Sequence, residues 1–435
     1  MNSSPRFKLF LMMVLEFFIW GAWLPLIFGY LPSLKFTPGE QAWILNAFPI
    51  AAVVGMFFSN QFADRNFAAE KFMAFSHLIG GLAMLGLAFT KDFWPFFALM
   101  AIHCLLYVPT ISIANSIAFA NMKDPQKEFG LVRMGGTLGW ILAAWPFTFI
   151  LVDWDKVRQA NPQGLVNWVG TVLSSGLTGD AMKAATIWTF IVAGIASLLL
   201  AALSLALPHT PPKKAGEAGA ENLAWLEALK LLKHPFVLVL WLVTLVDSFV
   251  HNAYFNWTGT FLGTGVEAHG VGIPGNWIMP VMSVGQIAEL LTMFILGATL
   301  QRLGWRTTMV IGILGHTARF AVYAFFPQSK ELIVVVQVLH GICYAFFFGA
   351  VYIFVDAYFP KDVRASAQGL FNVMILGIGA LVANSICSIL LQQTFTTNNL
   401  IDFRGLFLVP MFASMAAAVA LALFFRPPPK PAAPA

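Results

Sequence analysis

Long apolar runs recur along the whole chain and alternate with shorter polar connections. A helix needs about 20 apolar residues to cross the hydrocarbon core of a bilayer, and the runs reach this length. Transmembrane β-strands would instead appear as segments of about ten residues with alternating polarity. The pattern predicts an all-α integral membrane protein with twelve transmembrane helices. The runs cover residues 8–31, 41–62, 71–90, 93–117, 132–152, 183–207, 236–263, 274–297, 307–326, 331–357, 365–392 and 403–425.

Composition and charge agree with this interpretation. Hydrophobic residues make up 59% of the chain and charged residues 10%, whereas soluble domains carry about 25% charged residues. The Lys and Arg residues gather in the loops that share a side with the N-terminus, so the positive-inside rule puts both termini in the cytoplasm. We expect a multi-pass protein of the inner (plasma) membrane whose first run is a retained helix rather than a signal peptide. The net charge of +5 is then explained without a nucleic-acid partner.

The longest inner connection divides the runs six and six. It is rich in Pro, Gly, Ala and Lys, and its second part, around 222–233, has the pattern of a short amphipathic helix on the membrane surface. An outer excursion at about 153–182 is polar and Gly-rich. The expected organisation is an N-terminal six-helix half (1–207), a cytoplasmic linker (208–235), a C-terminal six-helix half (236–426) and a disordered tail (427–435).

The two halves echo each other in their cytoplasmic loops. "NQFADRNFAAEK" follows the second run and "GATLQRLGWRTT" follows the eighth. Two six-helix halves with such loops resemble the major facilitator superfamily, in which substrate binds near the bilayer midplane between the halves. Asp64 and Arg65 stand at the acidic and basic positions of that superfamily's signature and are the expected cytoplasmic gate, although Asn60 replaces a usual glycine.

Charged side chains inside the runs are candidate site residues. Each costs about 2.5–3.5 kcal/mol at a helix centre, so those present usually face a cavity or a partner. Asp356 lies near an inner end and is assigned to the gate, while a structural role is the simpler interpretation of His103, His316 and Arg319. The full set is Glu16, Arg133, Asp247, Glu289, Arg319, Asp356, His103, His251, His316 and His340.

Two pairs of polar residues have helical spacing. Arg133 and Thr137 are four apart, and Gln286 and Glu289 are three apart, so each pair shares one helix face. One interpretation is that both pairs line a central substrate cavity. The alternative is structural: glycine-mediated packing beside Arg133, and an interhelical hydrogen bond for Glu289.

Aromatic and amide residues cluster in "DSFVHNAYFNWTGTFL" (247–262). Aromatic faces and amide edges suit a planar heteroaromatic ligand, although packing is the commoner role of aromatics in a span. Asn252 and Asn256 are the candidate amides. His340 and Tyr344 form a further same-face pair, and Glu16 precedes Trp20 and Trp23, which could wall a cavity.

No pattern of catalysis is present. The sequence lacks an activated nucleophile with a base, a phosphate-binding loop and a metal-binding motif, and its three cysteines lie singly in apolar runs. Scattered polar groups suit binding and release rather than bond-making, so we expect no enzyme activity, no cofactor and no metal. A small-molecule substrate and membrane lipid are the expected partners.

"FFIWGAWLP", "RMGGTLGW", "GQIAELL" and "RASAQGLFN" resemble the nucleoside:proton symporter family of the major facilitator superfamily, the bacterial nucleoside and xanthosine permeases. The resemblance extends from the first run to the twelfth. It implies that Arg133, Thr137, Gln286 and Glu289 line a nucleoside site. It also implies an amide on the seventh span, for which Asn252 is the best match and His251 or Asn256 the alternatives.

The tenth span departs from the family. The family has a tyrosine and, further on, a Phe-Asp pair whose aspartate is linked to proton coupling, but these positions are His340, Tyr344 and Ala345 here. Glu289, His340 or Glu16 would have to carry the proton instead. We expect a monomeric, proton-coupled nucleoside transporter; the alternatives are a pH-independent facilitator, a sugar or oligosaccharide permease and, less favoured, a membrane sensor.

Overall fold

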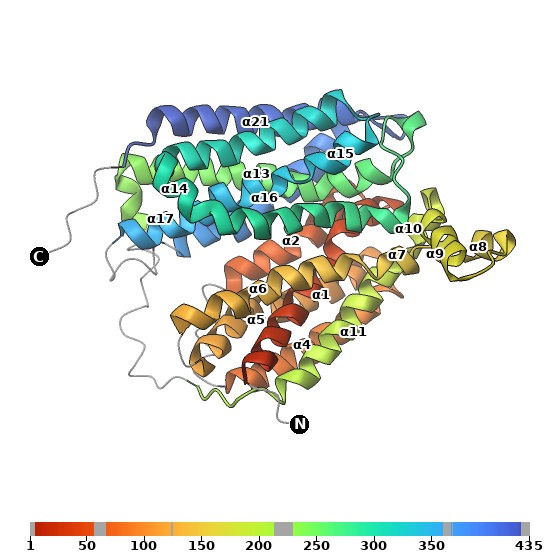
Figure 1. Ribbon diagram of the computed structural model, residues 1–435, viewed down its shortest axis with the longest axis horizontal. Coiled ribbons are helices and arrows are strands. Elements are labelled where there is room, and N and C mark those ends of the chain that lie inside the picture. The colour runs from red at the N-terminus through yellow and green to blue at the C-terminus, as the bar shows by residue number, and fades with distance from the viewer. Residues whose placement is uncertain are drawn as a thin grey trace, which may run out of the picture.

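The chain folds into two bundles of long helices that lie side by side (Figure 1). The computed structural model describes residues 5–55, 67–122, 125–212, 229–359, 367 and 369–427. The expected gate residues Asp64 and Arg65, and most of the expected linker helix, lie outside these ranges. The first bundle consists of α1 (Pro5–Ser33), α2 (Pro38–Val54), α4 (Ala69–Leu87), α5 (Phe93–Asn121), α6 (Pro125–Ala144) and α11 (Ile187–Ser204), with short helices α7 (Phe147–Ile150), α8 (Trp154–Ala160), α9 (Leu165–Ser174) and α10 (Gly179–Ala185).

The second bundle follows a 3-10 turn, η3 (Leu231–Lys233). Several of its spans change helix type along their length, and a two-residue hairpin, β1 (Thr396–Thr397) with β2 (Leu400–Ile401), precedes the last helix. The other elements are α13 (Pro235–Gly263), η4 (Val266–Ala268), α14 (Gly275–Phe325), α15 (Lys330–Val336), α16 (Leu339–Cys343), η5 (Tyr344–Gly349), α17 (Ala350–Tyr358), η6 (Val373–Ile378), α19 (Gly379–Ser385), η7 (Ile386–Leu391), α20 (Gln392–Thr394) and α21 (Phe403–Phe424).

The longest helix, α14, contains two of the predicted runs, 274–297 and 307–326. It turns at Gly304, whose φ of 72° lies in the left-handed region that glycine adopts without a steric cost. The two arms of α14 therefore act as two consecutive helices, and the residues after Gly304 return toward α21 and α16.

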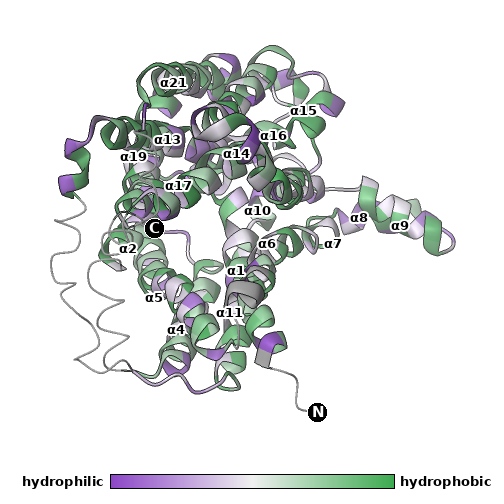
Figure 2. Cartoon of the chain, turned by 60° about the vertical axis from the view of Figure 1, so that its left-hand side comes forward, coloured by the Kyte–Doolittle hydropathy of each residue, from purple (hydrophilic) through white to green (hydrophobic). Residues whose placement is uncertain are grey.

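Eight helices of the described chain are long and apolar enough to cross a membrane. The ribbons of both bundles are coloured largely hydrophobic, with many of the hydrophilic residues at helix ends and loops (Figure 2), and large apolar side chains such as Leu291 and Phe424 are exposed. This distribution is the one expected of a protein whose solvent is lipid. The eight are Arg6–Ser33, Phe93–Asn121, Gly179–Ser204, Pro235–Gly263, Gly275–Phe325, Lys330–Tyr358, Gly369–Thr394 and Phe403–Phe424.

Glycines set the contact between α1 and α6. A Cβ on Gly135 would lie 2.8 Å from the Phe10 carbonyl oxygen, and one on Gly139 would overlap the Val14 carbonyl oxygen. Small residues four apart permit this backbone approach between membrane helices. Helical spacing puts Thr137 on the other side of α6 from these two glycines, away from their contact with α1.

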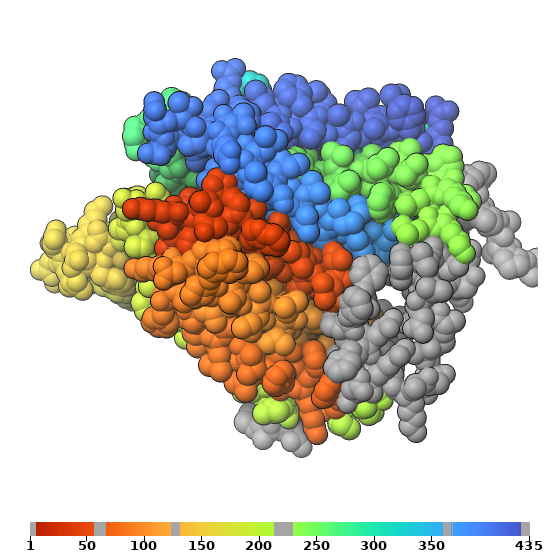
Figure 3. All heavy atoms as spheres, turned by 180° about the vertical axis from the view of Figure 1, so that it is seen from behind, coloured from red at the N-terminus to blue at the C-terminus, as the bar shows by residue number. Residues whose placement is uncertain are grey.

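The bundles meet along a diagonal seam (Figure 3), where α1 packs against α13, α6 against α14 and α2 against α19. The backbone approach is close at Gly259, where a Cβ would lie 2.6 Å from the Pro25 carbonyl oxygen. Side-chain hydrogen bonds cross the seam from α2: Asn46 Nδ2 donates to Ser385 Oγ at 2.9 Å, and Asn384 Nδ2 donates to the Leu45 carbonyl at 3.0 Å.

The 153–182 excursion adds a second set of contacts between the bundles. Trp277 Nε1 donates to the Leu173 carbonyl at 2.8 Å, Asn276 Nδ2 donates to the Thr148 and Leu173 carbonyls, and the Gly275 backbone N–H bonds to Leu177. These contacts tie the start of α14 to the excursion. Figure 1 shows the two bundles meeting near α7 and α10 and separating toward α5 and α17.

Candidate functional site

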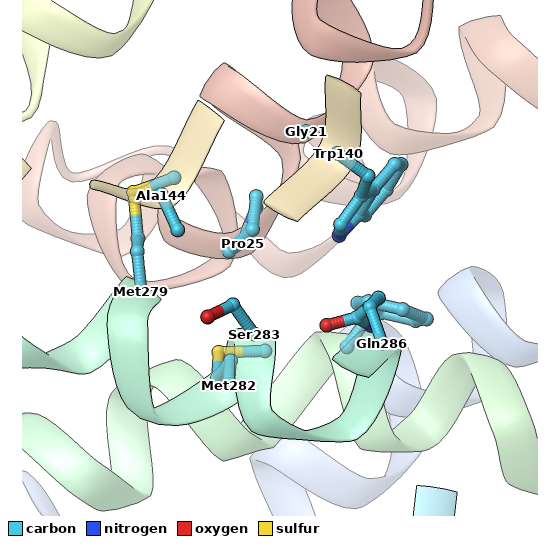
Figure 4. A pocket seen from close by; sticks show the side chains of 9 residues that line it. Gly21, Pro25, Trp140, Ala144, Met279, Met282, Ser283 and Gln286 are labelled. Atoms are coloured by element: carbon cyan, nitrogen blue, oxygen red, sulfur yellow. The ribbon is translucent and has the colours of Figure 1, made fainter. Parts of the chain in front are cut away.

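A pocket lies on the seam, with one wall from each bundle (Figure 4). Gly21, Pro25, Trp140 and Ala144 come from the first bundle and face Met279, Met282, Ser283 and Gln286 from α14. Phe255 of α13 completes the lining. The pocket therefore combines aromatic and thioether side chains with an amide and a hydroxyl, and in this conformation it is narrow, with room for about one water molecule.

The α14 wall carries the predicted pair of Gln286 and Glu289. Their position depends on a close crossing with α16, because a Cβ on Gly285 would lie 2.8 Å from His340 Cβ, and one on Gly341 would overlap the Glu289 backbone nitrogen. Gln286 is buried and lines the pocket, whereas Glu289 is half-buried one turn farther along. Within the described residues, the Glu289 carboxylate has no hydrogen-bond or ion-pair partner at contact distance, so it is available to a ligand.

Arg133 and Thr137 lie on α6, the helix that supplies Trp140 and Ala144 to the pocket; both are half-buried and neither lines the pocket itself. The Arg133 guanidinium carbon stands 4.4 Å from the Phe17 ring centroid, and its charge acts electrostatically on the Glu289 carboxylate in the opposite bundle. A Cβ on Gly136 would lie 2.5 Å from Arg133 Nη1, so the glycine makes room for the guanidinium. The contacting helices α6 and α14 thus carry opposite charges on the two sides of the seam.

The candidate amides of α13 have different surroundings. Asn256 is buried and donates to Asn384 Oδ1 at 3.0 Å, so it supports the Asn384 bond that crosses the seam. Asn252 is half-buried and donates to the Ser248 carbonyl at 2.8 Å. Asn252 does not line the pocket, but its exposure makes it the better candidate of the two for a ligand.

His340, His251 and Tyr344 form an aromatic group behind Gln286. His340 is buried, stacks on His251 with ring centroids 5.1 Å apart, and has Gln286 Nε2 3.3 Å from its Nε2 atom. Tyr344 is half-buried at the start of the π-helical segment η5 and lies 5.9 Å from the His251 ring. His340 thus supports Gln286, and Tyr344 is the more accessible of the predicted pair.

Glu16 lies inside the first bundle, away from the pocket. Its carboxylate accepts from Thr110 Oγ1 at 2.8 Å and pairs with His77 Nε2 at 3.0 Å. Trp20 stacks on the Phe48 ring at 4.5 Å. Of the residues in this stretch, only Gly21 and Pro25 reach the pocket.

The tenth span carries no carboxylate at its middle. Ala345 is fully buried in an apolar cluster with Val243 and Leu296. Asp356 is exposed near the end of α17. Among the described residues, no group of three or more His, Cys, Asp or Glu side chains is arranged to hold a metal ion.

Sequence reasoning missed several lining residues. Trp140 stands seven residues after Arg133 and three after Thr137, so helical spacing could have placed it on their face. Ser283 stands three residues before Gln286 in the same way. The methionines Met279 and Met282 carry no such signal, because unpatterned apolar residues fill all the spans.

Two helical bundles that meet around a pocket on their seam are the arrangement of the major facilitator fold. A model of the nucleoside H+ symporter family matches residues 3–178 and 163–430. The chain therefore belongs to the nucleoside H+ symporter family and is a transporter of the inner membrane, not an enzyme.

Curated relatives and solved structures agree with this assignment. The chain is 28% identical to the putative nucleoside transporter YegT of Escherichia coli K12 over 89% of this chain and 85% of the relative. It is 27% identical to the xanthosine permease of the same organism, over 98% and 96%. A crystal structure of the nucleoside transporter NupG aligns with a TM-score of 0.78 and 23% identity, covering 98% of this chain and all of that one.

Proposed function

We propose that the chain moves nucleosides across the inner membrane together with protons, by alternating access of a site between its two halves. The observation that carries the proposal is the pair of facing walls: Gln286 lines the pocket, the unpaired Glu289 carboxylate follows one turn later, and Arg133 approaches from the other bundle. Family membership supports the substrate class and the proton.

Each wall has a part in binding. Gln286 and Glu289 would hold ribose hydroxyls or a base edge, while Arg133 and Thr137 would contact the nucleoside from the first half. The Trp140 indole meets the Phe255 ring edge-on at 6.0 Å beside the pocket, so the two offer a stacking surface for a base. Further proposed contacts are Asn252, His340 and Tyr344.

Glu16, Glu289 and His340 were the expected proton carriers. Their contacts indicate which of them is free to exchange a proton. Glu16 is already held by His77 and Thr110, and His340 is buried against Gln286 and Arg319. Glu289 has an accessible carboxylate beside the substrate pocket. Among these three, Glu289 is the best placed to exchange a proton as substrate binds.

The proposed topology has twelve spans. Counting α14 as two spans, and adding α2, α4 and α6 to the helices of membrane length, brings the number to twelve. The halves would be 1–207 and 236–426, joined by a cytoplasmic linker at 208–235, with both termini in the cytoplasm and 427–435 as a tail. Asp64 and Arg65 would form part of the cytoplasmic gate, and the unit would be a monomer.

Alternating access requires the seam to open at each end in turn. In this state the Trp277 contact with Leu173 holds the excursion end, and the Asn46 and Asn384 bonds hold the seam midway along α2. Positive-inside topology makes this end the outer one, so the proposed state is closed to the outside. Opening outward must break these bonds, which are single hydrogen bonds of modest net strength.

Uptake of labelled uridine and adenosine into proteoliposomes, with and without an inward proton gradient, tests the proposal. Native protein should accumulate nucleoside with the gradient, and Glu289→Gln, which preserves shape and removes the charge, should not. Glu331→Gln, at an exposed position, is the matched control. Equilibration that ignores the gradient would mean a facilitator. Failure to take up any nucleoside, with competition by free sugars in a sugar-uptake assay, would mean a sugar permease.

A further inference from the structure

A chain of buried polar groups runs from α13 to the pocket through the second bundle. Asp247, His316 and Arg319 are each fully buried. His316 Nε2 lies 3.8 Å from Asp247 Oδ2, and Arg319 Nη2 lies 2.8 Å from His316 Nδ1. Arg319 Nη1 then donates to His340 Nδ1 at 3.0 Å, so a neutral His340 ring carries its proton on Nε2, which contacts the Gln286 amide in the pocket wall at 3.3 Å. This row of polar groups therefore connects a buried carboxylate, that of Asp247, to the substrate pocket.

Hydrogen-bond chemistry fixes the state of His316. A guanidinium can only donate, so Nδ1 of His316 must accept from Arg319. The neutral imidazole then carries its proton on Nε2, which faces Asp247. Protonating Nδ1 as well would break the bond to Arg319 and place two positive charges in contact in a buried site. An additional proton in this cluster therefore has its best acceptor in Asp247.

The Asp247 carboxylate is the incompletely satisfied member of the chain. Neither oxygen has a hydrogen-bond partner among the described residues, and the nearest imidazole nitrogen is at 3.8 Å. Glu16, equally buried in the first bundle, has partners on both oxygens. A buried carboxylate without hydrogen bonds is costly when charged, so proton uptake relieves that cost, whereas Glu16 gains nothing comparable.

Few helices place titratable or charged side chains near Asp247. Besides His316 and Arg319 of α14, α13 itself contributes His251, and α16 contributes His340 and Cys343, whose thiol interacts with Asp247 electrostatically. The only charged residue of α21 is Arg404, which lies over Phe325 at the far end of its helix. The segments η6 and α19 carry no charged residue, and Glu16 of α1 is turned into the first bundle.

We propose that Asp247 is a proton-binding group of the transport cycle, an inference that rests on the proposed proton-coupled transport. One proton from the outer solution forms an O–H bond with a carboxylate oxygen of Asp247, and the same proton leaves to the cytoplasm when the bond breaks. No other atom changes its bonding. While this proton is bound, Asp247 is neutral and no negative charge faces His316.

The row of buried polar groups from Asp247 to Gln286 links the protonation of Asp247 to the substrate site. When Asp247 is charged, its negative charge offsets the positive charge of the Arg319 guanidinium on the other side of the His316 ring. With Asp247 neutral, the buried positive charge loses its counter-ion and acts more strongly on His340 and, through it, on Gln286. Since Gln286 lines the pocket, the protonation of Asp247 changes the field at the bound nucleoside.

The test compares net accumulation with nucleoside counterflow in proteoliposomes, since counterflow needs no net proton movement. In Asp247→Asn, which resembles the protonated form, the gradient-driven accumulation ratio should fall to unity while counterflow persists. Glu16→Gln, a matched change at an equally buried carboxylate with two hydrogen-bond partners, should keep accumulating. Gradient-driven accumulation by Asp247→Asn would overturn the inference.

Two further measurements keep the outcomes separable. If Asp247→Asn does not fold, Asp247→Glu, which keeps a titratable group in altered surroundings, should accumulate nucleoside with a shifted pH midpoint, and an unchanged midpoint would contradict the inference. The native protein reports on the proposed function itself. If native protein shows no nucleoside uptake, the proposed function has failed; if it accumulates nucleoside and Asp247→Asn does so equally, only the role of Asp247 has failed.

Discussion

Gln286 and His340 lie with their Nε2 atoms 3.3 Å apart, at the place where Gly285 and Gly341 let α14 and α16 cross closely. The amide side of this pair faces the pocket between the bundles, and the imidazole side faces the buried guanidinium of Arg319. One contact therefore joins the substrate site to the charged interior of the second half. A substitution of either residue should therefore alter the surroundings of the other.

Replacing His340 with Phe should both destabilise the protein and weaken nucleoside binding. The ring fills similar space, but Arg319 loses an acceptor in a buried site, which costs about 1–3 kcal/mol. Gln286 loses the partner that orients it. Thermal unfolding in detergent and nucleoside titration calorimetry measure the two effects. His234→Phe, at an exposed histidine, is the control; equal unfolding temperatures for the two variants would contradict the prediction.

Arg133→Lys should weaken nucleoside binding although it keeps the positive charge. The guanidinium lies over the Phe17 ring and can donate two parallel hydrogen bonds, whereas an ammonium group is a single flexible point charge. We expect affinity to fall about tenfold, the loss of one charge-assisted hydrogen bond. Arg302→Lys, at an exposed position, should bind as the native protein does. Unchanged affinity in Arg133→Lys would remove Arg133 from the site.

The close approach of α1 and α6 gives a prediction about folding. A side chain at Gly139 has no room beside the Val14 backbone, so Gly139→Leu should force the helices apart at a cost of about 1–3 kcal/mol or more. Gly297→Leu is the matched control, because that glycine is exposed on α14 with no atom near its Cβ position. Unfolding temperatures should fall for the first variant only. Equal stability would mean that α1 and α6 pack without needing the glycine.

Regular spacing explains what could be predicted from the sequence. The pairs Arg133 with Thr137 and Gln286 with Glu289 each lie within one helix, so their shared face follows from helix geometry alone. Trp140 could have been added by the same rule. The lengths of the apolar runs likewise predicted helices of membrane length.

Contacts between distant segments could not be predicted in this way. Asp247 and His316 lie on different spans, and nothing in the spacing of either helix indicates that their side chains meet. The structural interpretation of His316 and Arg319 therefore missed their connection to the pocket. The contacts of the 153–182 excursion with α14 were hidden for the same reason, since they involve backbone carbonyls such as that of Leu173, which any residue supplies.

Glu70 should make stability depend on pH. It stands in the first turn of α4, ahead of the apolar run 71–90. Burial raises its pKa, but hydrogen bonds from His209 Nδ1 and the Thr210 backbone N–H outweigh this and hold the pKa below the ordinary value of 4.5. Because the folded pKa is the lower one, the carboxylate stabilises the fold at pH values above 4.5, and this contribution is lost as the pH falls through the folded pKa.

The Glu70→Gln variant isolates this effect. At neutral pH it should unfold at a lower temperature than the native protein, and the difference should shrink as the pH falls below 4.5. Thermal unfolding across this range measures it. Glu331→Gln, at an exposed position, should follow the native curve at every pH. A constant difference between Glu70→Gln and native protein would assign the effect to packing instead of to charge.

Trp277→Phe should favour opening of the seam at the excursion end. It removes the donor to the Leu173 carbonyl while keeping an aromatic ring, and the loss of about 1 kcal/mol shifts a two-state population about fivefold. Spin labels on cysteines introduced at Gly170 and Glu331, both exposed, would report the separation, since Cys104, Cys343 and Cys387 are buried and should not react. The longer distances should gain population in Trp277→Phe but not in Trp94→Phe, at a tryptophan that is 72% exposed. Identical distance distributions would mean that the bond to Leu173 does not restrain opening.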